Sequence, residues 1–368
     1  MRWLVVGVLA LHGLIHAMGF AKAFGFAELP QLGQPISRAM GVAWLLAGGL
    51  VIATAAMLAI GSRHTWMAGA IAILLSQAVI LTAWRDAWAG TLANIVLLLV
   101  VAHSWFTAGP RSFQAQFERD AAEGLARITA SAIVTDTDLA PLPAPVQRYL
   151  RLAGVVGQPR VQNYRLRFTG RIRSAPGAAW MPFEADQQSF ADPPTRLFHM
   201  RARMFGLPVD VFHRLTSGHA TMQVKLIGAI SMVDARGPEM DRAETVTLFN
   251  DMCLLAPGTL VGPGITWEPI DGHSARARFT NAGQTISAEL LFDADGWLSN
   301  FVSDDRTRSS PDGRTFTPLR FSTPVRDHRA FGPLTLAAYG EGRWLLPEGE
   351  FIYGEFELQD VTMNLPPR

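Results

Sequence analysis

Hydrophobic positions run together in the first 106 residues of the chain and alternate with polar positions in most of the rest. Each apolar run has roughly the 20 residues needed to cross a hydrocarbon core of about 30 Å. Tryptophans fall near the ends of these runs, where interfacial anchors are common. The pattern therefore predicts an all-α four-helix transmembrane bundle over residues 1–108, with spans at residues 3–20, 39–60, 66–84 and 88–106.

The first run also admits a second interpretation, which is a signal peptide. Arg2 would be its charged start, and residues 21–23 resemble a cleavage site. We favour a span, because the run contains two histidines. Four spans place both chain ends on one side of the membrane. The positive-inside rule then favours a cytoplasmic C-terminal domain, because four arginines flank that side (Arg2, Arg63, Arg111 and Arg119) against three basic residues on the other (Lys22, Arg38 and Arg85).

The segment from residue 109 to residue 145 is predicted to link the bundle to a second domain. Residues 111–135 are amphipathic and fit a helix along the membrane surface or a continuation of the fourth span. Residues 136–145 carry three prolines and are typical of a stiff connector. A short helix is expected over residues 146–153.

Alternation of apolar and charged residues begins near residue 161 and is typical of strands with one wet face. The strands follow one another too closely for crossover helices, so the sheet is expected to be antiparallel. Eleven or twelve strands in one sheet should curl into a half-barrel, a curved sheet or a barrel. The predicted strands are residues 163–173, 181–190, 196–204, 209–215, 221–227, 265–270, 275–280, 285–292, 298–304, 315–321, 334–345 and 351–363.

One long helix, residues 238–256, interrupts the strands of this predicted domain, 146–368. Gly237 and Pro238 suit the start of a helix, and Pro257 ends it. On a helical wheel, an apolar face lies opposite an acidic face. We expect the helix to cover a curved sheet, with its acids turned toward a cleft or water. The apolar face carries Val246, Phe249, Cys253 and Ala256, and the acidic face carries Asp241, Glu244 and Asp251.

Composition narrows the classes of function. The formal net charge is +1, so no overall field favours nucleic acid as a partner. Cys253 is the single cysteine, which excludes an intramolecular disulfide and a thiolate metal cluster. The chain has no nucleotide-binding loop, nucleophile elbow or zinc-protease motif. We therefore predict no cofactor, and the sequence carries no signal for an oligomeric state.

Histidines inside the predicted spans are the weak candidates for a metal site. His12 and His16 lie one helical turn apart, a geometry that can hold a metal or haem iron. His103 in the fourth span is a candidate partner. We favour hydrogen bonds between helices, because no third ligand can be placed and such bonds are ordinary in membrane bundles.

Carboxylates are the candidate catalytic residues. Paired carboxylates can divide acid and base roles when their environments separate their pKa values, which suits a membrane-bound hydrolase. The alternative is that the helix acids complement the helix dipole and that the later pair flanks a loop beside Arg306. We favour this second interpretation, although Asn250 and Asp251 are poor helix formers in mid-helix. The candidates are Glu239, Asp241, Glu244, Asp251, Asp304 and Asp305.

Several stretches resemble an uncharacterised family of bacterial membrane proteins that is known only as a domain of unknown function. They are residues 12–16 (HGLIH), 142–150 (LPAPVQRYL), 237–241 (GPEMD), 249–257 (FNDMCLLAP) and 303–306 (SDDR). More distantly, residues 288–296 (AELLFDADG) followed by residues 316–322 look like the last strands of lipoprotein-carrier half-barrels. That resemblance implies a concave face that holds acyl chains under a helix. The resemblance to the bacterial membrane-protein family implies that the protein is located in the inner membrane.

These observations lead to two hypotheses of function. The first is a membrane-anchored protein that binds an apolar or lipid-like ligand in its curved sheet, with the lipid bilayer as its other partner. The second is a membrane-bound hydrolase that uses acids of the 239–251 helix with Asp304 and Asp305. Methionine and aromatic side chains suit an adaptable apolar pocket. The candidate ligand-binding residues are Trp180, Met200, Met222, Phe249, Asn250, Met252 and Arg306.

Overall fold

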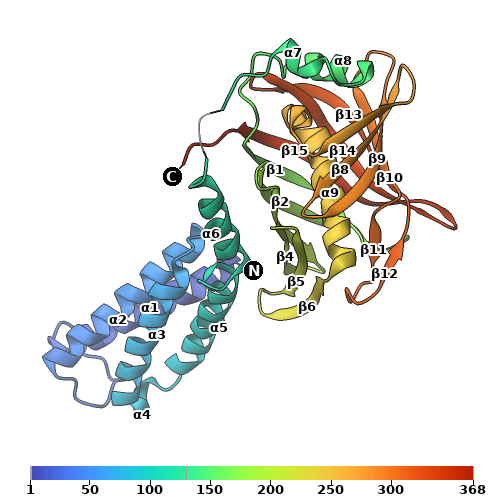
Figure 1. Ribbon diagram of the computed structural model, residues 1–368. Coiled ribbons are helices and arrows are strands. Elements are labelled where there is room, and N and C mark those ends of the chain that lie inside the picture. Colours follow the sequence, from blue (N-terminus) through green and yellow to red (C-terminus); the bar gives the residue numbers. More distant parts are fainter. Residues whose placement is uncertain (1, 129–130, 368) are drawn as a thin grey trace. The chain divides into compact units, whose positions relative to one another are not determined.

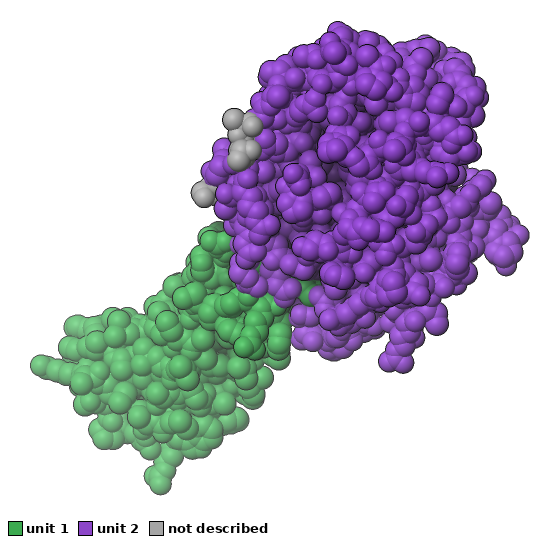
Figure 2. Space-filling view, in the orientation of Figure 1, with its two compact units in different colours: residues 1–115 green, residues 116–368 purple. Residues whose placement is uncertain are grey.

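The computed structural model describes residues 2–128 and 131–367. Contacts divide the chain into two compact units, a helical unit (Met1–Ala115) and a β unit (Gln116–Arg368) (Figure 2). Residues 129–130 of the predicted linker lie outside the described residues. Each unit is described below by itself.

The helical unit contains α1 to α5 and the start of α6. Among the described residues, four helical segments are long and apolar enough to cross a membrane, namely Arg2–Ala23, Arg38–Ala59, Thr65–Thr82 and Gly90–Leu125, the last of which covers α5 and α6. Small residues bring α1 and α2 close together, since a Cβ atom on Gly48 would lie 2.5 Å from the carbonyl oxygen of Gly13. The helices are α1 (Arg2–Ala23), α2 (Arg38–Ala59), α3 (Thr65–Thr82), α4 (Trp84–Ala87), α5 (Gly90–Ala108) and α6 (Phe113–Leu125).

Most of the β unit is one 13-stranded antiparallel sheet that curves without closing (Figure 1). Its order is β6-β5-β4-β3-β2-β1-β15-β14-β13-β10-β9-β8-β7, so the first and last strands of the unit pair in its middle. The predicted fold class is confirmed. The strands are β1 (Asn163–Ile172), β2 (Met181–Phe190), β3 (Thr195–Met204), β4 (Leu207–Thr216), β5 (His219–Leu226), β6 (Ile230–Arg236), β7 (Ile265–Pro269), β8 (Ser274–Asn281), β9 (Gln284–Phe292), β10 (Leu298–Ser303), β13 (Phe321–Phe331), β14 (Leu334–Leu346) and β15 (Gly349–Met363).

Strand prediction differs from the structure around residues 307–331. The segment predicted as one strand at 315–321 forms β12 (Phe316–Pro318), which pairs with β11 (Thr307–Ser309) in a separate two-stranded sheet. The long strand β13 was not predicted, because Pro324 and the charged residues of its exposed half break the alternation. Pairing with β14 holds this half in the sheet nevertheless. Strand β6 was also missed.

The short helices before the sheet belong to the core of the β unit. They are α7 (Asp136–Leu139) and α8 (Ala144–Leu152). Leu139 and Val146 are fully buried in the same apolar core as the sheet. The proline-rich residues 136–145, expected as a stiff connector, are therefore packed against the β unit rather than standing free.

Helix α9 (Pro238–Leu255) lies across the concave face of the sheet (Figure 1). Gly237 precedes it with a φ of 105°, a conformation that favours glycine, and Pro238 occupies its first turn. At the other end, the hydroxyl of Tyr149 on α8 donates a 2.8 Å hydrogen bond to the carbonyl oxygen of Cys253. This bond satisfies one of the carbonyls that a helix end leaves unpaired. Local residues thus set the start of α9, and the distant Tyr149 contributes to fixing its end.

The two faces of α9 meet different surroundings. Phe249 is fully buried and stacks on Phe279 of β8 at 5.1 Å, with Phe301 of β10 at 5.9 Å. The apolar face is thus packed directly against β8 to β10. The opposite face borders a cavity. The residues of α9 that line this cavity follow helical spacing: Met240, Ala243, Glu244, Thr247, Asn250, Asp251, Leu254 and Leu255.

Candidate functional site

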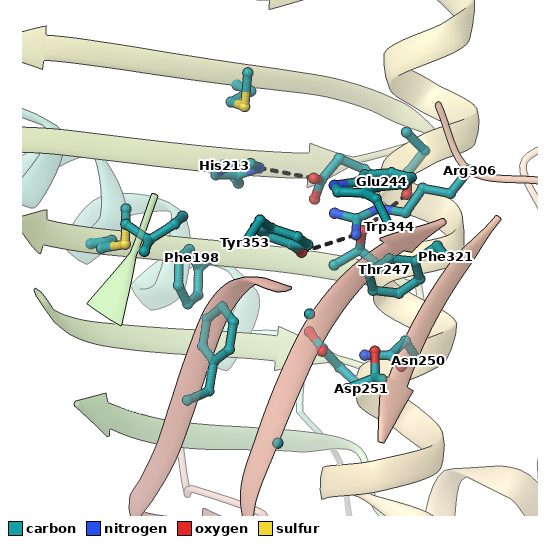
Figure 3. A pocket seen from close by; sticks show the side chains of 18 of the residues that line it. Phe198, His213, Glu244, Thr247, Asn250, Asp251, Arg306, Phe321, Trp344 and Tyr353 are labelled. Carbon is teal, nitrogen blue, oxygen red and sulfur yellow. Dashed lines mark hydrogen bonds and ion pairs between the residues drawn. The ribbon is translucent and has the colours of Figure 1, made fainter. Parts of the chain in front are cut away.

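A cavity of about 360 Å³ lies between α9 and the sheet (Figure 3). Small-molecule sites are usually concave and mostly apolar, with a few polar groups that orient the ligand. This cavity has that character, since aromatic and aliphatic side chains from β1, β3, β5, β13, β14 and β15 make up much of its wall. Its large apolar residues include Phe168, Phe198, Met200, Met222, Phe321, Val325, Trp344, Phe351, Phe356 and Leu358.

Arg196 of β3 ties the sheet to α9 from within the cavity wall. Its Nε donates to Oδ2 of Asp251 at 2.6 Å, and its Nη1 donates to Oε2 of Glu244 at 3.1 Å. His213 of β4 lies 2.8 Å through Nδ1 from the other oxygen of Glu244. Gln187 of β2 donates to Asp251 at 2.9 Å. We call these five residues the Arg196 cluster.

The residues of the Arg196 cluster form hydrogen bonds and ion pairs with one another. Arg196, Glu244 and Asp251 are each at least nine-tenths buried, so their charges need partners in the protein. Burial by itself would raise the pKa of Glu244, but the charges of His213 and Arg196, with the hydrogen bond from His213 and the charge of Arg306, lower it to about 2. Glu244 is therefore a carboxylate at neutral pH. It anchors α9 to strands β3 and β4.

Arg306 also lines the cavity, and its guanidinium group is surrounded by aromatic rings. Its guanidinium carbon lies 4.1 Å from the ring centre of Phe321 and 5.1 Å from that of Trp344. Its Nη1 donates to the hydroxyl of Tyr353 at 3.1 Å, while its Nε is buried without a hydrogen-bond partner among the described residues. Gly342 leaves room for Tyr353, because a Cβ atom there would lie 2.6 Å from its ring. Figure 3 shows Arg306 beside these rings.

The predicted ligand-binding residues are divided between the cavity and other places. Met200, Met222, Asn250 and Arg306 line the cavity. Phe249 and Met252 do not, because they lie on parts of α9 that are packed into the apolar core. Trp180 stacks on Arg171 and Arg173 between β1 and β2 and is outside the lining.

The six candidate carboxylates do not converge on one cleft in the described structure. Glu244 and Asp251 line the cavity, as expected for acids turned toward a cleft, but they are buried ion-pair partners of Arg196 rather than exposed to water. The others lie elsewhere. Asp304 pairs with Arg320 at the surface, Asp305 pairs with Arg242, Asp241 accepts from the backbone N–H of Ala220 at 2.6 Å, and Glu239 is exposed in the first turn of α9.

His213 and Glu244 form a histidine–carboxylate pair that borders the cavity. Such a pair can serve as a general base when a hydroxyl or thiol lies within hydrogen-bonding distance of the other imidazole nitrogen. In the described part of the chain, no serine, threonine or cysteine forms a hydrogen bond with Nε2 of His213. The geometry thus offers a base without an attached nucleophile.

Two of the histidines in the candidate spans lie in a buried polar network of the helical unit. His12 contacts Oδ1 of Asn94 through Nε2 at 3.1 Å, and His16 contacts Oγ of Ser76 through Nε2 at 3.0 Å. Ser76 also donates to Asn94 at 2.9 Å. These bonds join α1, α3 and α5. His103 is exposed on α5 and is not part of this network.

Sequence reasoning missed Arg196 and His213 as residues of the cavity wall. Their signal is the period of two along a strand, because Arg196 has the same parity as Phe198 and Met200, and His213 the same as Val211. A charged residue on the apolar face of a strand requires a buried partner. The sequence thus indicates that both residues lie on the apolar face of their strands, but it does not identify the residues with which they pair.

Comparisons with known proteins identify a family and two distant structural likenesses. The model of a family of unknown function (DUF6544) matches residues 132–356. No curated protein matches the chain. A domain from Vibrio parahaemolyticus, proposed to be an outer membrane lipoprotein-sorting protein, is 8% identical with a TM-score of 0.32, over 55% of this chain and 86% of that one. A DUF1329 family protein from Desulfovibrio piger is 12% identical with a TM-score of 0.29, over 61% and 94%. Likenesses this low carry no argument about function.

Proposed function

The chain belongs to the DUF6544 family, whose function is unknown, and we propose that it is a membrane-anchored binding protein for an apolar or lipid-like ligand. The observation that carries the proposal is the largely apolar cavity of about 360 Å³ between α9 and the concave face of the sheet. Ligand sites of roughly 300–1,000 Å³ are typical of proteins that enclose small molecules. Four helices with the length and composition of membrane spans supply the anchor.

Two polar side chains in the cavity wall are further evidence that the cavity binds a ligand. The Oδ1 atom of Asn250 is buried and has no hydrogen-bond partner among the described residues, and the same holds for the hydroxyl of Thr323. Buried polar atoms are usually paired in native proteins, with protein, water or ligand groups. An amphiphile with a hydroxyl or ester group would supply partners for them.

Blocking the cavity is expected to remove copurifying lipid. Thr247 lies on the cavity face of α9 and is nearly buried, so Thr247→Trp would place an indole in the space of the ligand. We expect lipid extracts of the full-length wild type, purified in a neutral detergent, to contain a bound amphiphile by mass spectrometry. We expect the Thr247→Trp extract to contain at least several-fold less per mole of protein.

The matched control for this experiment is Thr266→Trp. Thr266 is exposed on β7 at the edge of the sheet and is not part of the cavity lining. Its extract should equal that of the wild type, because annular lipid from the helical unit is the same in all three samples. Melting curves identify a variant that has merely unfolded. Equal amounts of lipid in a folded Thr247→Trp variant would rule out the cavity as the binding site.

We further propose that the membrane is the bacterial inner membrane and that the β unit faces the cytoplasm. The support is the distribution of basic residues at the ends of the candidate spans. A fluorescent protein that folds only in the cytoplasm, fused after residue 368, is expected to fluoresce. An alkaline phosphatase fusion at the same point should be inactive. Activity of the phosphatase would place the β unit on the other side.

A further inference from the structure

Positive charge is in excess along the wall of the cavity. The described lining contains four arginines (Arg173, Arg196, Arg306 and Arg308) against two carboxylates (Glu244 and Asp251), a surplus of two positive charges when His213 is neutral. Both carboxylates pair with Arg196, and this group of three carries a net charge of −1 when His213 is neutral. The other three arginines, Arg173, Arg306 and Arg308, carry the positive charge of the wall, and we call them the arginine end of the cavity.

The arginine end is held by aromatic rings and backbone carbonyls. Arg308 of β11 donates to the carbonyl oxygen of Ser174, and Arg173 donates through Nε to that of Ile352 at 2.8 Å. The guanidinium carbons of both lie 5.3 Å from the ring centre of Phe351. None of the three arginines forms an ion pair with a carboxylate in the part of the chain that the structure describes.

The three arginines are grouped around two residues of β15, Phe351 and Tyr353, which lie two positions apart on the strand. The backbone N–H of Arg173 donates to the carbonyl oxygen of Tyr353 at 2.8 Å, and the hydroxyl of Tyr353 accepts from Arg306. The ring of Phe351 contacts the guanidinium groups of both Arg173 and Arg308. These contacts make one cluster from the residue that follows β1, the β10–β11 segment and β11, in the wall of a largely apolar cavity.

Arginine is suited to bind carboxylate and phosphate groups, because its planar fork of five N–H donors matches two oxygens at once. Arg306 uses one of its donors on Tyr353, and its buried Nε has no acceptor among the described residues. The charge of Arg306 contributes to the low pKa of Glu244, but Arg306 forms no direct ion pair among the described residues, and an anionic group of a ligand would supply one. Aromatic rings hold the guanidinium in place without occupying its donors.

We propose that the cavity takes an amphiphile with an anionic headgroup, a carboxylate or a phosphate ester, whose headgroup is bound by Arg306, Arg308 and Arg173. This inference rests on the proposed function, since it names the class of ligand for the same cavity. The hydrocarbon tail lies along the apolar wall toward Phe198 and Met200. The Arg196 cluster holds two carboxylates against one guanidinium, so it does not contribute to the binding of an anionic headgroup.

The test compares ligands that share one tail. The full chain, transferred from detergent to a neutral amphipathic polymer, is titrated calorimetrically with dodecyl phosphate, dodecanoate, dodecanol and inorganic phosphate. We expect the two anionic amphiphiles to bind at least 10-fold more tightly than dodecanol. Because a hydrogen bond to a charged group is strong, Arg306→Gln should weaken the anionic amphiphiles by roughly 10–100-fold and leave dodecanol within about 2-fold.

Further variants keep the test informative if Arg306→Gln does not fold. Arg308→Gln should weaken anionic binding in the same direction, and Arg306→Lys should retain part of it, since the charge remains but the fork is lost. Arg171→Gln is the matched control. Arg171 lies on β1 two residues before Arg173, is exposed, and is already paired with Glu355, so its loss should leave all affinities unchanged.

Each outcome separates the headgroup inference from the proposed function. Dodecanol binding as tightly as dodecyl phosphate, with no effect of Arg306→Gln or Arg308→Gln, would overturn the anionic headgroup and leave an apolar-ligand protein. Inorganic phosphate binding as tightly as dodecyl phosphate would show a free-anion site and overturn the amphiphile. Binding of none of the amphiphiles, together with lipid-free extracts, would overturn the proposed function itself.

Discussion

Arg196→Ala is expected to lower the free energy of unfolding of the β unit by about 3–5 kcal/mol, because it leaves two buried carboxylates without their cation. Glu244 and Asp251 are 1% and 6% exposed, so water cannot replace the guanidinium. The substitution also removes the link between β3 and α9. The measurement is urea unfolding of the full chain in a mild detergent, followed through the transition of the β unit.

Arg201→Ala on the same strand is the control for this loss. Arg201 is half exposed, and its contacts with Glu184 and Asp186 are 3.9 Å and 3.7 Å long. Exposed pairs of this kind contribute about 0–1 kcal/mol. Similar losses for Arg196→Ala and Arg201→Ala would contradict the structural role assigned to the Arg196 cluster.

The contribution of Glu244 is also expected to depend on pH. Its pKa is lowered in the folded state from 4.5 to about 2, so the stabilisation is present above pH 4.5 and disappears as the pH falls toward 2. A shift of this size corresponds to about 3 kcal/mol. The difference in stability between wild type and Glu244→Gln should therefore shrink across this range. A difference that stays constant from pH 6 to pH 2.5 would speak against a charged Glu244.

Phe249→Ala should cost about 3–5 kcal/mol, as expected for the loss of a buried aromatic side chain. Phe249 is fully buried between Phe279 and Phe301, on the face of α9 that packs directly against the sheet. Its neighbour Asn250 lies on the cavity face and has no hydrogen-bond partner for Oδ1 among the described residues. Asn250→Ala should therefore cost much less, about 1 kcal/mol or less, because it breaks no bond that the described structure contains.

The two substitutions are measured by the same unfolding transition and by the lipid content of purified protein. Phe249→Ala should lower stability while the folded fraction keeps its ligand. Asn250→Ala should keep stability and change the lipid content or affinity. The reverse result, with Phe249→Ala altering the ligand and Asn250→Ala destabilising the fold, would mean that α9 is rotated relative to the cavity.

Features that depend on residues close together in the sequence could be predicted, and features that depend on contacts between distant residues could not. Helix 238–256 was readable because Gly237, Pro238 and Pro257 act locally, and α9 (Pro238–Leu255) follows these signals closely. The exposed half of β13 was not readable, because its residues neither alternate nor favour a strand, and only pairing with β14 holds them there. The arginine end was missed apart from Arg306, since its members come from residues 173 to 308.

The sequence by itself determined the two classes of segment in this protein, apolar helices followed by alternating strands, and the place of the one long helix among the strands. These features follow from the period and length of hydrophobic patterns, which act within about 20 residues. Only the tertiary structure decided that Glu244 and Asp251 pair with Arg196, whereas Arg173, Arg306 and Arg308 have no carboxylate partner among the described residues. The physical reason is that charge compensation in a buried space depends on distances between side chains from different strands, and the curvature of the sheet sets those distances.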